Sequence, residues 1–303
     1  MNTVIAAAEP ETYSVNFGKQ FIPEEFTPLS YTQSYLELSN EQQLRYNQLH
    51  AFYFNEQIMF FEATLGQCVL DALLRRPWPE RVKEALQQLR EEERKHTQMF
   101  RRLNQMCAPQ LYATCDFHFV RVPRPWMAVG NWASNRPSMF PMIVWLMLLQ
   151  EERSLPYSRG FVRQQAVLEP HFVEVQRLHM ADEADHVRLD EELIDALWAP
   201  AAPFLRRINA RLFSWMLVEF FNTPRRAQLR VVDELVREFP ALAPLRKEMR
   251  RQLLALSQDA QYQMSLYSRD IVPETFARFD EWPEFRSLAI SSYQPRAQMK
   301  EKR

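Results

Sequence analysis

The chain has 303 residues, of which 47% are hydrophobic and 25% are charged, and its formal net charge is −1. A nucleic-acid-binding protein usually shows a basic excess or a basic stripe, so this balance argues against a polyanionic partner. Glycine is rare, at 4 residues, which disfavours phosphate-cradling and sheet-rich folds and favours long helices.

The elements expected from the N-terminus onward begin with an arm. Residues 1–37 show no lasting periodicity, and we expect them to extend over the body of the protein. Ser39 or Asn40 then caps a predicted helix that runs to about residue 76. A second helix is predicted over 79–106, a third over 138–163, where Pro156 could introduce a kink, and a fourth over 168–198.

The segments between and after these helices contain more prolines. Residues 108–137 are predicted to be irregular, and shorter helices are predicted near 203–221, 225–238 and 242–268. Residues 271–303 are expected to form an irregular tail with a basic end. The four long helices are apolar on more than one side, so the sequence predicts an all-α four-helix bundle with additional C-terminal helices, over residues 38–270.

The location is expected to be cytoplasmic. Cys68, Cys107 and Cys115 form no close pair, as is typical of reduced thiols. The N-terminal sequence lacks the basic and apolar regions of a signal peptide. The most apolar run, from Met139 to Leu149, is too short to cross a bilayer.

Two polar residues interrupt the apolar stripe of the second helix. The stripe places Glu93 and His96, three residues apart, where buried apolar side chains are expected; its other members are Val82, Leu86, Leu89, Phe100 and Leu103. The neighbouring Glu91 and Glu92 fall off this stripe.

The fourth helix repeats this arrangement. Its stripe is interrupted by His179, Glu183, His186 and Asp190, so that a second Glu-x-x-His pair has a further histidine one turn before it. A single Glu-x-x-His is usually part of a solvated helix face. Two copies on buried faces favour a metal site, because buried carboxylates need a partner, a proton or a metal ion. Carboxylates and imidazoles together suit iron or manganese.

Ferritin-like bundles complete such a site with one glutamate from each of the other two helices. The first helix offers Glu56 and Glu62. Glu62 lies as far before Arg76 as Glu93 lies after Pro79, so Glu62 matches the depth of Glu93 in an antiparallel pair. The third helix offers the adjacent Glu151 and Glu152, between which the periodicity does not choose.

The motifs resemble those of the ferritin-like di-iron N-oxygenases of the p-aminobenzoate N-oxygenase type. The resemblance rests on the sequences LHMADEADHVRLDEEL, EEERKH, FFEATL and LLQEERS, and covers about residues 40–200. It implies a ferritin-like fold and two iron ions, with manganese as a possible substitute. It favours Glu152 over Glu151 through the spacing to the extra histidine, and implies seven ligands: Glu62, Glu93, His96, Glu152, His179, Glu183 and His186.

The resemblance also implies the chemistry. Members of the family activate dioxygen through a peroxo di-iron(III) species and oxidise an amine to hydroxylamine, nitroso or nitro products. The substrate could be an arylamine, an amino acid or an amine tethered to a carrier protein. The sequence carries no nicotinamide- or flavin-binding motif, so electrons are expected from an external donor. A homodimer is expected because twofold dimers are the commonest symmetric oligomers.

Other interpretations stay open. The chain could be another di-iron hydroxylase or desaturase, a non-catalytic ferritin-like protein, or a radical-generating subunit that uses Tyr53 or Tyr157. Asp190 could orient an imidazole or point to solvent. A substrate carboxylate could pair with Arg159, Arg163 or Arg211. Residues 108–137, with Trp126 and Trp132, could cover the site.

Overall fold

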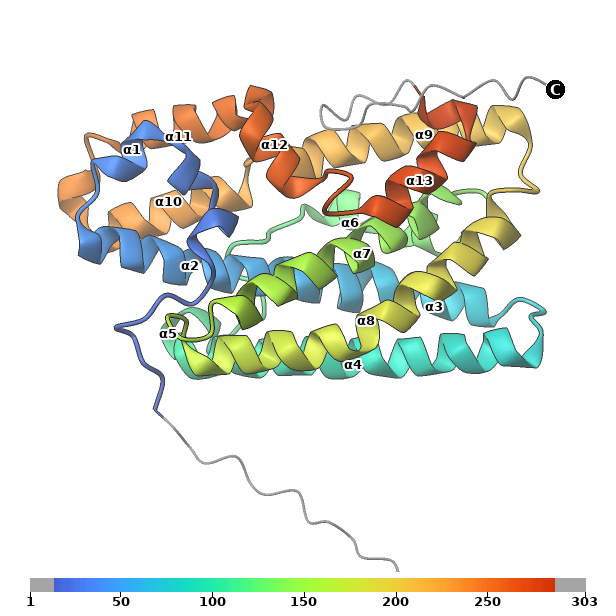
Figure 1. Cartoon of the computed structure of the whole chain (residues 1–303), viewed down its shortest axis with the longest axis horizontal. Coiled ribbons are helices and arrows are strands. Elements are labelled where there is room, and N and C mark those ends of the chain that lie inside the picture. The colour runs from blue at the N-terminus through green and yellow to red at the C-terminus, as the bar shows by residue number, and fades with distance from the viewer. Residues whose placement is uncertain (1–13, 287–303) are drawn as a thin grey trace, which may run out of the picture.

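The computed structural model of the protein describes residues 14–286 (Figure 1). Within this range the regular structure is helical and no β-strand forms; one isolated bridge joins Gln20 to Leu168. The predicted all-α, ferritin-like fold class is confirmed. The basic C-terminal end and the first part of the N-terminal arm lie outside the described residues.

Four helical segments form the core of the bundle. They are α2 (Asn40–Phe60) with its continuation α3 (Gln67–Leu74), α4 (Glu80–Cys107), α7 (Met142–Arg163) and α8 (Pro170–Leu197). α7 packs along α8, α8 along α4, and α2 and α3 along α4. The N-terminus of α2 is stabilised by a capping box, in which the Ser39 hydroxyl accepts a hydrogen bond from the Gln42 backbone amide. α8 begins with Pro170 at its first position.

A π-helical turn, Phe61–Gly66, joins α2 to α3. Such turns contain one extra residue per turn and occur often at functional sites. This turn carries Glu62, and it changes the direction of the side chains on α3 relative to those on α2. A regular helical periodicity assumed across residues 40–76 therefore could not have indicated the π-helical turn.

Additional helices pack against one side of the core (Figure 1). They include α6 (Arg124–Ser134), α9 (Pro203–Met216) with a π-helical end at Leu217–Asn222, α10 (Ala227–Glu238), α11 (Arg246–Ala255), α12 (Ala260–Leu266) and α13 (Pro273–Glu281). Three expectations are corrected here. Residues 108–137 contain α6 and the short α5 (Pro109–Tyr112); the predicted helix 242–268 is divided, because Asp259 caps a new helix; and α13 forms within the expected irregular tail.

The N-terminal arm is held tightly against the bundle. It contains two short 3-10 turns, Glu24–Phe26 and Pro28–Tyr31, and the one-turn α1 (Gln33–Leu36). Phe21 is fully buried and stacks on Phe172 of α8, with ring centroids 4.4 Å apart. The Asn47 side chain accepts from the amides of Phe21 and Ile22, so the arm is a structural layer of the fold.

One helical stretch, Asn40–Leu74, is long and apolar enough to cross a membrane. The same property is expected of a core helix in a bundle that is apolar on several sides. In this structure the stretch carries the buried Glu56 and Glu62, and both of these side chains form hydrogen bonds with other parts of the bundle.

Candidate metal centre

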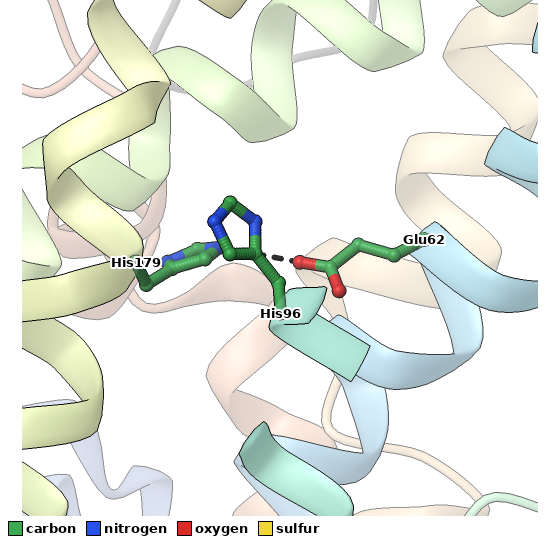
Figure 2. A group of neighbouring side chains, drawn as sticks. All are labelled: Glu62, His96 and His179. Carbon is green, nitrogen blue, oxygen red and sulfur yellow. Dashed lines mark hydrogen bonds and ion pairs between the residues drawn. The ribbon is translucent and has the colours of Figure 1, made fainter. Parts of the chain in front are cut away.

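Two groups of buried side chains lie in the middle of the bundle, each able to hold a metal ion. The first consists of Glu62, His96 and His179, and the second of Glu93, Glu151 and His186. Within each group the candidate ligand atoms lie within 4.8 Å of one another. Figure 2 shows the first group, whose side chains converge from the π-helical turn, α4 and α8.

Glu183 lies between the two groups. Its Oε1 atom is 2.9 Å from His179 Nε2 and 3.9 Å from His96 Nδ1 in the first group. The same atom is 3.8 Å from His186 Nδ1 in the second. A single carboxylate therefore faces both groups, as a bridging ligand would.

The local helix geometry explains these positions. Glu93 and His96 are three residues apart on α4, as are Glu183 and His186 on α8, so each pair shares one helix face. His179 precedes Glu183 by one turn. Glu93 and His96 belong to different groups, whereas Glu183 lies between the groups and His186 belongs to the second.

Several polar atoms at this centre are buried without any hydrogen-bond partner. They are Glu93 Oε1, Glu183 Oε1, His96 Nδ1 and His186 Nδ1. Buried polar atoms are nearly always satisfied in folded proteins, and each unsatisfied atom calls for an explanation. These atoms are oxygens and nitrogens suited to iron or manganese and they face the same space, so the residues fit a pair of such ions.

The electrostatics of the centre lead to the same conclusion. Burial raises the pKa of Glu62 to about 8 and holds the pKa values of Glu93 and Glu183 well above the usual range. Burial alone would raise the pKa of Glu151, but its interactions with the adjacent Glu183 and His186 side chains lower it to about 2. Without metal, protons must therefore compensate the crowded carboxylates, and a dication would replace them.

The pKa values of His179 and His186 shift in opposite directions. Burial lowers the pKa of His179 to about 4, which keeps its ring neutral and available as a ligand. For His186, burial is outweighed by interaction with the nearby carboxylates of Glu151 and Glu92, and the pKa rises to about 9.

Two acidic residues outside the groups orient the imidazoles. His96 Nε2 lies 3.1 Å from Asp182 Oδ2, and His186 Nε2 lies 3.1 Å from Glu92 Oε2. In both cases the carboxylate holds one ring nitrogen while the other, Nδ1, faces the centre. Neither Asp182 nor Glu92 lies on an apolar stripe, so periodicity did not indicate them; the only sequence signal for Glu92 was that it is adjacent to Glu93.

Asp190 behaves differently from both expectations for it. It is fully buried, so it does not point to solvent, and both of its carboxylate oxygens lack a hydrogen-bond partner among residues 14–286. Burial holds its pKa well above the usual range, which favours the protonated form. Glu92, and not Asp190, bonds to the His186 ring.

The preference for Glu152 as a ligand is corrected by the structure. Glu152 accepts hydrogen bonds from the backbone amides of Glu274 and Thr275, at 2.6 and 2.8 Å. These amides belong to the first turn of α13, whose N–H groups have no partner within the helix. Glu152 therefore anchors α13, and Glu151 takes the position in the second group, 3.7 Å from His186 Nδ1.

The structure places Glu62, and not Glu56, beside His96 and His179, so Glu62 stays the predicted ligand. Glu56 is buried away from both groups and accepts hydrogen bonds from the Tyr112 hydroxyl and from the backbone amides of residues 118–120. It fastens the segment that follows α5. Thr97 donates to Glu62 Oε2, which leaves Glu62 Oε1 turned to His179 at 3.1 Å.

Two neighbouring cavities, which share several lining residues, lie beside the centre. The inner chamber has a volume of about 80 Å³ and reaches Glu62, Glu151 and His179. The outer chamber, of about 360 Å³, is lined mostly by apolar and aromatic side chains of α2, α6, α7, α9 and α12. Phe54, Gln57, Phe61, Arg153, Tyr157 and Phe221 line both chambers.

The cavity walls revise the expectations for substrate contacts. Arg159, Arg163 and Arg211 are exposed and line neither chamber, whereas Arg153 lines both. Trp126 and Trp132 line the outer chamber from α6, so this part of residues 108–137 does cover a cavity.

The family described as P-aminobenzoate N-oxygenase AurF matches residues 8–268 of the chain. This range contains both groups of candidate ligands, Glu183 and all the residues that line the two cavities. No curated protein matches the chain.

Proposed function

Since the chain belongs to the p-aminobenzoate N-oxygenase family, it is an oxygenase, and we propose that it inserts oxygen from dioxygen into an amine. The observation that carries this proposal is the pair of Glu/His groups with Glu183 between them and His179 as a third histidine. The inner chamber, which opens onto these residues, gives a small substrate access to them.

The proposal assigns the ligands as follows. Glu62, His96 and His179 would hold one iron ion, and Glu93, Glu151 and His186 would hold the other, with Glu183 shared. Manganese could substitute, since the donor atoms suit both metals. When bound, the iron pair supplies the redox chemistry that activates dioxygen.

The protein itself orients the ligands and limits access to the centre. Thr97 donates to Glu62, and Ser154 donates to Glu183 Oε2 at 2.9 Å, which fixes both carboxylates. Asp182 and Glu92 fix the imidazole rings of His96 and His186. The aromatic walls of the inner chamber, Phe54, Phe61 and Phe221, restrict the entry of water.

The proposal includes the partners that such chemistry requires. Insertion of one oxygen atom of dioxygen into an amine leaves the other atom to be reduced to water, which takes two electrons and two protons. We therefore propose an external electron donor, because the sequence offers no motif for an electron-carrying dinucleotide. A cytoplasmic homodimer that acts on a small amine, free or tethered to a carrier protein, completes the proposal.

The test is the metal content of the purified protein and its reaction with dioxygen. The variants are His179→Ala and Glu183→Ala, and the matched control is Arg159→Gln on the exposed face of α7. We expect about two irons per chain, in line with the paired Glu-x-x-His template, in the wild type and the control. The two variants should bind less, and the reduced wild type should show a transient absorption band with dioxygen. Iron content that is absent, or indifferent to His179 and Glu183, would contradict the proposal.

A further inference from the structure

Arg153 is the one arginine that lines both the inner and the outer chamber among the described residues. It follows Glu151 and Glu152 on α7 and reaches the junction between the chambers. Its guanidinium donates to the hydroxyls of Tyr267 and Tyr157, at 3.1 and 3.3 Å, and lies over both rings.

No carboxylate forms an ion pair with Arg153 within residues 14–286. An arginine carries a permanent positive charge and five N–H donors, and here two donors are engaged, both with neutral phenols. Arg153 is only partly exposed, and a charge that is largely shielded from water is costly unless it is paired. An anion supplied from the cavity would complete this arrangement.

Gln57 is a second polar side chain that lines both chambers and could bind a ligand. It belongs to α2, lines both chambers and has no side-chain hydrogen bond among residues 14–286. Its amide can both donate and accept. Two helices therefore present unused donors to the same point, between the metal centre and the apolar outer chamber.

The sizes of the chambers decide which part of a substrate lies where. The inner chamber, about 80 Å³, has room for roughly five to eight water-sized groups at ~10–15 Å³ each. The head group of an α-amino acid, which consists of the amine, the α carbon and the carboxylate, fits this space. A benzene ring with an amine and a carboxylate at opposite ends exceeds it. The outer chamber can take a large apolar body.

Building on the proposed function, we propose that the substrate is an α-amino acid with an apolar side chain. Its carboxylate would pair with Arg153 and accept from Gln57, which turns its amine toward Glu62 and His179. The side chain would extend past Phe54 and Phe221 into the outer chamber. A planar guanidinium can bind a carboxylate through two parallel hydrogen bonds, which fixes the orientation of the amine.

The experiment measures binding without turnover, by calorimetry of the iron(II)-loaded protein in the absence of dioxygen. The probes are L-leucine, L-methionine and L-phenylalanine, the amines that lack their carboxylate (isopentylamine for leucine and phenethylamine for phenylalanine), and 4-aminobenzoate. We expect an amino acid to bind roughly 10- to 100-fold more tightly than its amine counterpart, as is typical for a charged hydrogen-bonded pair.

Arg153→Gln should remove this preference, and Arg153→Lys should restore part of it, because lysine keeps the charge but loses the planar fork. Arg159→Gln, on the exposed face of the same helix, should behave like the wild type. If Arg153→Gln does not fold, the comparison between each amino acid and its amine on the wild type still decides the question.

Three outcomes would overturn the inference: binding of the amines as tight as that of the amino acids, binding of 4-aminobenzoate with no binding of any amino acid, or no binding of any probe. The metal analysis separates this inference from the proposed function. A protein that binds iron and reacts with dioxygen but ignores amino acids loses the substrate assignment and keeps the oxygenase function. A protein without iron loses the function itself.

Discussion

Glu151 and Glu152 are consecutive on α7, yet their carboxylates belong to different parts of the structure. Glu151 lies 3.7 Å from His186 in the metal centre, whereas Glu152 accepts from two amides at the start of α13. Successive residues on a helix point about 100° apart, so one can enter the bundle centre while the other faces a neighbouring helix.

This division predicts two different phenotypes. Glu151→Gln should reduce the iron content, because it removes a charged ligand from the second group. Glu152→Gln should retain iron but lower the free energy of unfolding by about 1–3 kcal/mol, since a charged acceptor for two buried amides is weakened. Iron analysis and chemical denaturation of both variants make the measurement. Loss of iron in Glu152→Gln with normal iron in Glu151→Gln would restore the assignment that the resemblance favoured.

The carboxylates behind the histidines should control metal affinity. Asp182→Asn and Glu92→Gln preserve size but weaken the acceptors that fix the rings of His96 and His186. Substitution of such supporting residues typically lowers metal affinity about 10- to 100-fold. Titration of iron(II) against a competing chelator measures this change.

The control for this prediction lies on the same helix. Asp185 of α8 is exposed and pairs with Arg188, so Asp185→Asn should leave iron affinity unchanged. Equal affinity in all the variants would show that packing alone orients the imidazoles.

The metal-free protein should lose stability as the pH rises from 7 to 9. Glu62 and His186 both have pKa values raised on folding, to about 8 and about 9. The folded state therefore binds protons that the unfolded state releases, and this stabilisation disappears as the pH passes those values. The lowered pKa of His179 acts only toward acid pH, outside this window.

Thermal unfolding from pH 7 to 9 tests this prediction, with a shift of roughly 2–4 °C for each kcal/mol in a protein of this size class. Iron-loaded protein is the control. Because iron competes with protons for the same ligands, its stabilising effect should grow with pH. A metal-free protein whose midpoint rises across this range would show that the buried carboxylates are compensated in another way.

The central residues of the site could be predicted from the sequence, because helical periodicity alone identifies polar residues on apolar stripes. Glu93 and His96 on α4 and the polar positions of α8 stood out in this way, and the depth argument selected Glu62 over Glu56. The structure brings these residues together. Whether each of them binds iron stays a prediction that the variants above test.

Other features depend on contacts between distant segments, which periodicity cannot show. The choice between Glu151 and Glu152 depends on α13, which lies more than a hundred residues later in the chain. Glu92 and Asp182 matter through contacts between α4 and α8. The π-helical turn at Glu62 inserts a residue without any composition signal. The role of Arg153 depends on cavities that several helices build together.

The close approach of the N-terminal arm to α7 gives a last prediction. Phe26 of the arm stacks on Tyr157, with centroids 4.2 Å apart, and also lines the outer chamber. A Cβ atom at Gly160 would lie 2.6 Å from Phe26 Cζ, closer than real contacts allow. Gly160→Ala should therefore displace the Phe26 ring and lower the free energy of unfolding by about 1–3 kcal/mol, as overpacking does.

Gly130→Ala on α6 is the matched control, because its added Cβ would meet Leu65 Cδ2 at 3.4 Å, an ordinary contact. Alanine is also the better helix former, so this variant should be neutral or slightly more stable. Urea denaturation of both variants makes the comparison. Equal stability of Gly160→Ala and the wild type would mean that Phe26 moves aside at little cost, and that the arm is a movable wall of the outer chamber instead of a fixed one.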